Sequence, residues 1–144
     1  MTRRQMRENC FILLFERAFV EYTPEELFAL AEECDEVSLN PIVRTYYNEI
    51  NNHLSEIDTI IEHNLKNWSI NRISKVALSL LRLAVYEICI LKEVEPAIAI
   101  NEAIEIAKTY STKEDANYIN GVLGSVVRSF SCISAIMFPF LFYL

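Results

Sequence analysis

Three arginines at the amino end, Arg3, Arg4 and Arg7, are the first residues of the chain that could bind a ligand. No acidic residue precedes Glu8, so the three guanidinium groups form a compact positive end on a chain with a formal net charge of −7. Guanidinium groups bind phosphate oxygens in bidentate geometry, which makes this end a candidate site for a nucleic-acid backbone. A solvated terminus without a ligand is the alternative interpretation.

The pair Asn117 and Tyr118 is a second candidate. A tyrosine ring can stack on an unpaired base while a neighbouring amide hydrogen-bonds to the edge of that base. The helical periodicity is equally consistent with a Tyr118 ring that packs in the core. Trp68, the one tryptophan of the chain, allows the same two interpretations, and for it we favour packing at the start of a helix over base stacking.

No other pattern predicts catalysis or a metal site. An enzyme needs a paired acid and base, an activated nucleophile or a phosphate-binding loop, and the two glycines, Gly121 and Gly124, come too late in the chain for such a loop. The four cysteines and two histidines lack the spacing of zinc ligands. We therefore expect no enzymatic activity, no metal and no cofactor. We also expect reduced cysteines in the core of a cytoplasmic protein, since no secretory signal opens the chain.

The elements that would position these residues are helices. Hydrophobic residues make up 52% of the chain, and with so few glycines this composition favours a single all-α domain. Apolar residues recur every three or four positions in six segments. These segments begin at Arg3, Pro24, Pro41, Ile73, Pro96 and Glu114, and they end near Val20, Asp35, Asn64, Lys92, Tyr110 and Arg128. Thr23, Asn40 and Ser111 have the residue types and spacing of helix N-caps.

Two residues inside these helices carry a specific expectation. Arg82 lies between Leu81 and Leu83, which predicts a partly buried guanidinium paired with an acid such as Glu87 or Glu102, in a structural and not an RNA-binding role. Gly121 has no β-carbon and would allow a neighbouring backbone to approach closely.

Four blocks of the sequence, in this order, resemble the NusB family of bacterial transcription antitermination factors. The blocks are Arg3-Arg4-x-x-Arg7-Glu8 leading to Leu14-Phe15-Glu16, Trp68-x-x-x-Arg72-Ile73-Ser74 with Leu80 to Glu87, Ala99 to Lys108, and Tyr118 to Leu123. The resemblance spans about Thr2 to Arg128. It implies a compact bundle of about six to seven helices in two subdomains, which we assign as an RNA-binding domain over residues 1–128.

The resemblance also implies a function and partners. The family binds the boxA RNA of nascent ribosomal RNA transcripts together with the ribosomal protein NusE, as part of the antitermination complex of RNA polymerase. The arginine-rich start and Tyr118 match positions that contact RNA in the family, and Asn117 stays a candidate through its place beside Tyr118. The partner protein is expected to dock near four apolar residues: Phe15, Ala77, Leu80 and Leu81.

The chain departs from the family in three places. Ala77 stands where the family commonly carries an acid, and the amino end has fewer basic residues than is usual. The third departure is the uncharged segment 129–144, which we separate as an apolar tail. It is shorter than the roughly 20 residues that a membrane-spanning helix needs, and Pro139 interrupts it. We expect no membrane span, and packing on the bundle, self-association as a homodimer or an altered end of the gene remain open.

Two other functions fit the same residues. One is a protein-interaction module that binds a helical partner without RNA. The other is an RNA-binding accessory domain related to that of ribosomal RNA cytosine methyltransferases.

Overall fold

The computed structural model describes residues 1–34, 37–66 and 69–141, with side chains as far as residue 130. Its elements are α1 (Arg3–Arg17), α2 (Pro24–Glu32), α3 (Pro41–Asn52), α4 (Leu54–His63), η1 (Ile70–Arg72), α5 (Lys75–Val85), η2 (Tyr86–Leu91), α6 (Pro96–Tyr110) and α7 (Lys113–Leu141). No strand occurs in these ranges, so the predicted all-α class is confirmed. Trp68 lies outside the described residues, and both interpretations of it stay open.

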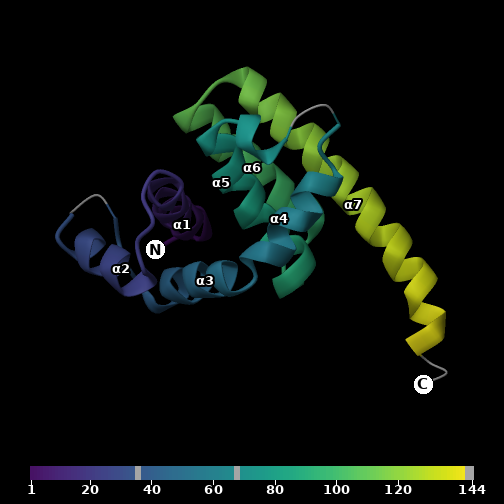
Figure 1. Ribbon diagram of the computed structural model, residues 1–144, viewed down its shortest axis with the longest axis horizontal. Coiled ribbons are helices and arrows are strands. Elements are labelled where there is room, and N and C mark those ends of the chain that lie inside the picture. The colour runs from purple at the N-terminus through teal and green to yellow at the C-terminus, as the bar shows by residue number, and fades with distance from the viewer. Residues whose placement is uncertain (35–36, 67–68, 142–144) are drawn as a thin grey trace.

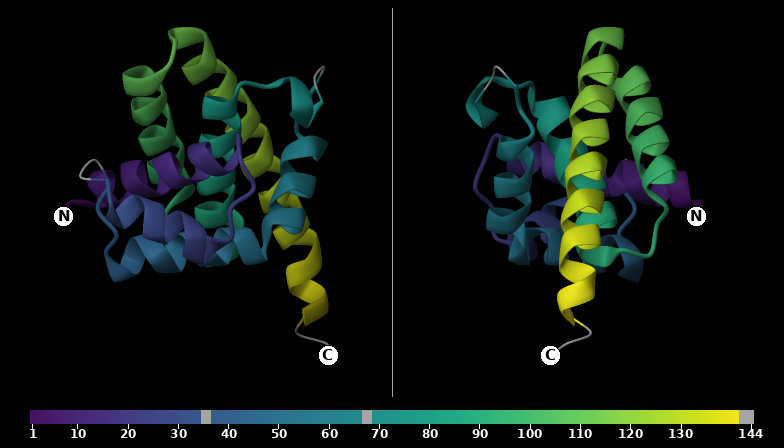
Figure 2. Two further views of the ribbon diagram at one scale, coloured as in Figure 1. Left: turned by 60° about the vertical axis from the view of Figure 1, so that its left-hand side comes forward. Right: turned by 90° about the vertical axis from the view of Figure 1, so that its right-hand side faces the viewer.

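The helices form two groups around α5. Helices α1, α2 and α3 lie on one side of the molecule, and α4 to α7 lie on the other (Figure 1). Helix α5 packs against α1, α4, α6 and α7, and it is the centre of the core. Helices α6 and α7 run side by side in opposite directions, and α7 then continues beyond the rest of the bundle (Figure 2). This arrangement confirms the predicted helical bundle.

Side-chain caps start the helices at the predicted places, with one shift. The Thr23 hydroxyl accepts a hydrogen bond from the Glu26 amide at 3.2 Å, and Asn40 Oδ1 accepts one from the Val43 amide at 2.8 Å. For α7 the cap is Thr112 and not Ser111, because Thr112 Oγ1 accepts the bond from the Asp115 amide at 3.1 Å. Local sequence was therefore a good guide to where helices begin.

The helix predicted from Pro41 to Asn64 is two helices, and that prediction was wrong. His53 leaves the helical conformation with φ −107° and ψ 15°, so α3 ends before it and α4 begins after it. The run Asn51-Asn52-His53 has low helix propensity. The side-chain amide of Asn51 donates a hydrogen bond to the backbone carbonyl of Tyr47, with Nδ2 and the oxygen 2.8 Å apart. The break lets α3 pack on α1 while α4 packs on α5.

The helix predicted from Ile73 to Lys92 contains a change of helix type. Helix α5 passes at Tyr86 into the π-helical η2, in which the Lys92 amide bonds the Glu87 carbonyl at 3.0 Å. Lys92 ends the element in the left-handed conformation, with φ 60°. Wide π turns are common at functional sites, and this one borders a cavity of about 530 Å³, which is discussed below.

Helix α7 is continuous from Lys113 to Leu141, so it extends past the predicted end at Arg128. The division of the chain at residue 128 stays a prediction. Among the described residues, no helix combines the length and the apolar character that crossing a membrane requires.

The expectation of a close backbone approach at Gly121 was wrong. Outside the backbone of its own helix, no atom lies within 4 Å of the position that a β-carbon would occupy there.

We predict that Gly121→Ala raises the free energy of unfolding by about 0.5–1 kcal/mol, since alanine is the better helix former. Urea unfolding measures the change. Gly124→Ala is the matched comparison and should gain less, because its β-carbon would lie 3.4 Å from Arg128 Nη1. A loss of stability at Gly121 would contradict the open space seen there.

Candidate nucleic-acid interface

The first turn of α1 decides where the three arginines point. Thr2 and Gln5 form a capping box, in which Thr2 Oγ1 accepts from the Gln5 amide at 3.1 Å and Gln5 Oε1 accepts from the Thr2 amide at 2.8 Å. Because a helix turns once in 3.6 residues, Arg3 and Arg7 share one side of α1 and Arg4 lies about 100° away. The three guanidinium groups therefore do not form one patch.

Arg7 is part of the core. Its side chain is 4% exposed, and its Nε and Nη2 donate to the two carboxylate oxygens of Glu87 at 2.8 and 2.9 Å. The Tyr46 hydroxyl donates to the same carboxylate at 3.3 Å. The hydrogen bonds with Glu87 raise the pKa of Arg7. The sequence analysis grouped Arg7 with the RNA-binding residues. In the fold its guanidinium forms an ion pair with Glu87 that joins α1 to η2. We therefore leave Arg7 out of the proposed phosphate contacts.

Arg4 and Arg3 are accessible in different ways. Arg4 donates from Nε and Nη2 to the carboxylate of Glu102 on α6 at 2.8 and 2.9 Å, and its side chain remains 49% exposed. The hydrogen bond raises the pKa of Arg4 and lowers that of Glu102. Arg3 is exposed, and within the described chain it has no ion pair. Of the three arginines, Arg3 is therefore the one whose guanidinium has no acidic partner in the described chain.

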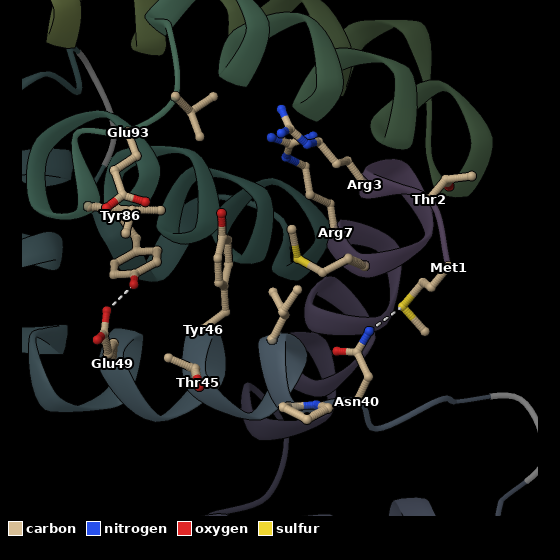
Figure 3. A pocket seen from close by; sticks show the side chains of 15 residues that line it. Met1, Thr2, Arg3, Arg7, Asn40, Thr45, Tyr46, Glu49, Tyr86 and Glu93 are labelled. Carbon is tan, nitrogen blue, oxygen red and sulfur yellow. Dashed lines mark hydrogen bonds between the residues drawn. The ribbon is translucent and has the colours of Figure 1, made fainter.

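A cavity of about 530 Å³ opens beside Arg3 (Figure 3). Its floor consists of buried side chains, Met6, Arg7, Tyr46 and Tyr86. Its rim consists of exposed residues, Met1, Thr2, Arg3, Pro41, Ile42, Thr45 and Glu93. The Tyr86 hydroxyl donates to the Glu49 carboxylate on one wall. The cavity thus has cationic and anionic groups around an aromatic floor.

Tyr118 lies at the other end of α5 from Arg3. Its ring is half-buried, its hydroxyl is buried without a hydrogen-bond partner, and it lines a smaller cavity of about 260 Å³ with Arg72 and Ser74. Asn117 beside it is exposed. Ser74 precedes α5, whereas the cavity at Arg3 includes residues after η2. The 11 residues of α5 and the 6 residues of η2 therefore separate the Tyr118 cavity from the Arg3 cavity. At the rise of a helix this length corresponds to roughly 25 Å.

The predicted partner surface lies mostly inside the protein. Ala77, Leu80 and Leu81 are buried in the core, so their side chains are not available to a partner. Phe15 is half-buried, and its ring packs edge-on at 4.9 Å from the ring of Phe19, which is 62% exposed. Sequence reasoning missed Phe19; the one signal for it was an apolar residue just beyond the last turn of α1.

The predicted partners of Arg82 are taken by other arginines. Arg82 Nε and Nη2 donate to the Asp58 carboxylate on α4 at 2.9 and 3.0 Å. Glu87 and Glu102, the two acids expected for it, pair with Arg7 and Arg4. The expectation that Arg82 pairs structurally with an acid holds, but the choice of the acid was wrong.

The side chain of Cys132 lies outside the described part of the chain, and the other three cysteines divide into two groups. Cys10 and Cys89 are buried, and burial raises the pKa of the Cys89 thiol to about 11. Cys34 is exposed, which corrects the expectation that all the cysteines belong to the core. In the described ranges, no three His, Cys, Asp or Glu side chains gather as metal ligands would.

Comparison with known proteins supports the resemblance found in the sequence. The profile of the NusB family matches residues 4–128. The chain is 41% identical to the transcription antitermination protein NusB of Lachnoclostridium phytofermentans, over 88% of this chain and 99% of that protein. It is also 41% identical to the protein of the same name from Listeria monocytogenes, over 88% and 96% of the two chains.

Solved structures show the same fold. The structure of T. maritima NusB matches with a TM-score of 0.77 and 36% identity, covering 89% of this chain and 92% of that one. A chain in the crystal structure of antitermination factors NusB and NusE in complex with double-stranded RNA matches with a TM-score of 0.79 and 28% identity, over 88% and 96% of the two chains.

Proposed function

Because the chain belongs to the NusB family, we propose that it is an RNA-binding transcription antitermination factor that binds the boxA RNA of nascent ribosomal RNA transcripts together with NusE. Its relatives are named for antitermination, which is not an enzymatic activity, and this family membership confirms that the protein is not an enzyme. A factor of this kind acts on nascent transcripts in the bacterial cytoplasm, within the antitermination complex of RNA polymerase.

The free guanidinium of Arg3 beside a cavity is the observation that carries the RNA part of this proposal. Arg3 contacts phosphate directly, and Arg4 contributes a second charge that its ion pair with Glu102 holds in place. Asn117 and Tyr118 form a separate contact, which lies about the length of α5 away from Arg3. A transcript that reaches both contacts therefore runs along the bundle. Such an arrangement suits an extended single strand.

The partner surface in this proposal is the end of α1. Phe15 and the exposed Phe19 and Val20 form an apolar edge there. A neighbouring cavity of about 430 Å³, lined by Phe19, Lys75 and Leu78 among others, would receive partner side chains. Exposed aromatic residues of this kind often carry much of the energy of an interface.

Titration of boxA RNA at several salt concentrations tests the RNA part. We expect the affinity to fall with salt and Arg3→Ala to reduce the slope of log K against log salt by about 0.7, the value for one lost single-strand phosphate contact. Lys66→Ala, which removes an exposed charge outside both cavities, should leave the slope unchanged. A duplex of the same sequence tests strand preference, since the related complex contains double-stranded RNA. Equal slopes for the wild type and Arg3→Ala would reject the assignment of Arg3.

A comparison of NusE binding with and without boxA RNA separates this function from that of a pure protein-interaction module. The proposed function predicts that RNA strengthens NusE binding, because both ligands would be held in one complex. RNA that leaves the NusE affinity unchanged would favour the module, for which the exposed Phe19 is the supporting observation.

A further inference from the structure

The cavity beside Arg3 has a charge pattern that a phosphate does not explain. Arg3 and Arg7 face it from α1, but Glu87 neutralises Arg7, and Glu49 and Glu93 also line the walls. Counting these groups with Glu87 and with the amino-terminal ammonium of Met1, three positive charges meet three negative ones. A phosphate entering this cavity would therefore meet no net attraction, whereas a neutral group with donors and acceptors does not depend on a charge balance.

The shape and the lining suit a flat ring. The volume of about 530 Å³ lies within the usual range for small-ligand sites. The buried ring of Tyr46 stands between the arginines and Tyr86 (Figure 3). Met6 and Leu91 also line the cavity and add apolar surface. Aromatic and apolar walls of this kind hold unstacked nucleobases in single-strand RNA sites.

Two charged side chains of the lining remain free to read the edge of such a ring. Arg3 and Glu93 are exposed and have no ion pair in the described part of the chain. They lie on opposite sides of the cavity, with Arg3 on α1 and Glu93 after η2 (Figure 3). By contrast, Glu49 is engaged by the Tyr86 hydroxyl, and Arg7 bonds Glu87 through Nε and Nη2.

We infer that this cavity is a base-binding subsite that takes a guanine. The Glu93 carboxylate accepts from its N1–H and N2–H groups, and the two Nη groups of Arg3 donate to its O6 and N7, which leaves Arg3 Nε–H for the phosphate contact proposed above. Guanine offers two adjacent donors on one edge and two adjacent acceptors on another, and arginine bound to O6 and N7 is the commonest base-specific contact in proteins. Adenine, cytosine and uracil do not offer both pairs. The inference rests on the proposed function and adds to it the base that the site selects.

Short oligouridine RNAs with one variable base test the inference on the full-length protein. The variable base is guanine, inosine, which lacks the N2 amine, or adenine, and the free nucleoside guanosine is titrated separately. We expect the wild type to bind the guanine RNA roughly tenfold more tightly than the inosine RNA, as for one good base contact. In Glu93→Gln this preference should fall to about twofold or less. Glu95→Gln is the matched control, because Glu95 is exposed, lies outside the cavity and makes no capping hydrogen bond.

Each outcome decides a different point. RNA binding without preference among the three bases would overturn the guanine subsite and leave the proposed function standing. A guanine preference that survives Glu93→Gln would also overturn it, because another site would then read the base. If no RNA binds, the proposed function is rejected, and the guanosine titration alone then decides whether the cavity binds guanine. Guanosine binding that Glu93→Gln abolishes would support a subsite for the free nucleoside, and no guanosine binding would reject the site.

Discussion

Replacing Arg7 by alanine is expected to lower the free energy of unfolding by about 3–5 kcal/mol, because it leaves the buried carboxylate of Glu87 without its counter-charge. Glu87 is 1% exposed, so water cannot replace the lost guanidinium. Urea unfolding followed by circular dichroism measures the change. The slope of log K for boxA RNA against log salt should remain close to that of the wild type, because Arg7 is not among the proposed phosphate contacts.

Arg4→Ala is the control for this prediction. It removes a bidentate ion pair of the same geometry from the same helix, but at an exposed position where water screens the charges. Its stability loss should therefore be much smaller. The double variant Arg7→Met, Glu87→Gln should recover most of the lost stability, since an amide can still accept from the Tyr46 hydroxyl. Equal losses for Arg7→Ala and Arg4→Ala would show that Arg7 is not the core residue described here.

Leu81→Ala is expected to cost about 2–5 kcal/mol, the usual range for a cavity left by leucine in a packed core. Leu81 is fully buried on α5, the helix that contacts most of the bundle. Thermal or urea unfolding gives the loss. Partner affinity per folded molecule should not change, because the side chain does not reach the surface.

Phe19→Ala provides the opposite pattern. Its ring is largely exposed, so its removal should change stability by about 0.5 kcal/mol or less. Partner binding should weaken at least tenfold if Phe19 anchors the interface. If a fully folded Leu81→Ala variant bound NusE more weakly than the wild type, the result would show that α5 and not the end of α1 contacts the partner.

Much of the fold could be predicted from local sequence. The all-α class, the starts of α2, α3 and α6 and the central position of α5 follow from apolar periodicity, N-caps and prolines, which act within a few residues. The apolar spacing continues across the break at His53 and across the π turn at Tyr86, so periodicity did not reveal either of them. The break had a local signal in the low helix propensity of the run Asn51 to His53, and the fold uses it to pack α3 on α1 and α4 on α5.

The candidate site was predicted less completely. The sequence brought attention to the amino end, to Phe15 and to Tyr118, but it treated three neighbouring arginines as equivalent. In the fold they have three different roles: Arg7 is buried, Arg4 is paired and Arg3 is free. The cavity between α1, α3 and the end of η2 left no signal in the sequence, because its lining comes from distant segments.

The sequence by itself determined the family, the helical class and the residue types available for binding RNA. Only the tertiary structure decided which of those residues are accessible. Glu87 is 80 positions from Arg7, and Glu102 is 98 positions from Arg4. Burial and ion pairing depend on such distant contacts, whereas propensity and capping depend on neighbours in the chain. For this reason the chain alone indicated that the amino end could bind RNA, and the fold decided that, of the three arginines there, Arg3 is the one without an acidic partner among the described residues.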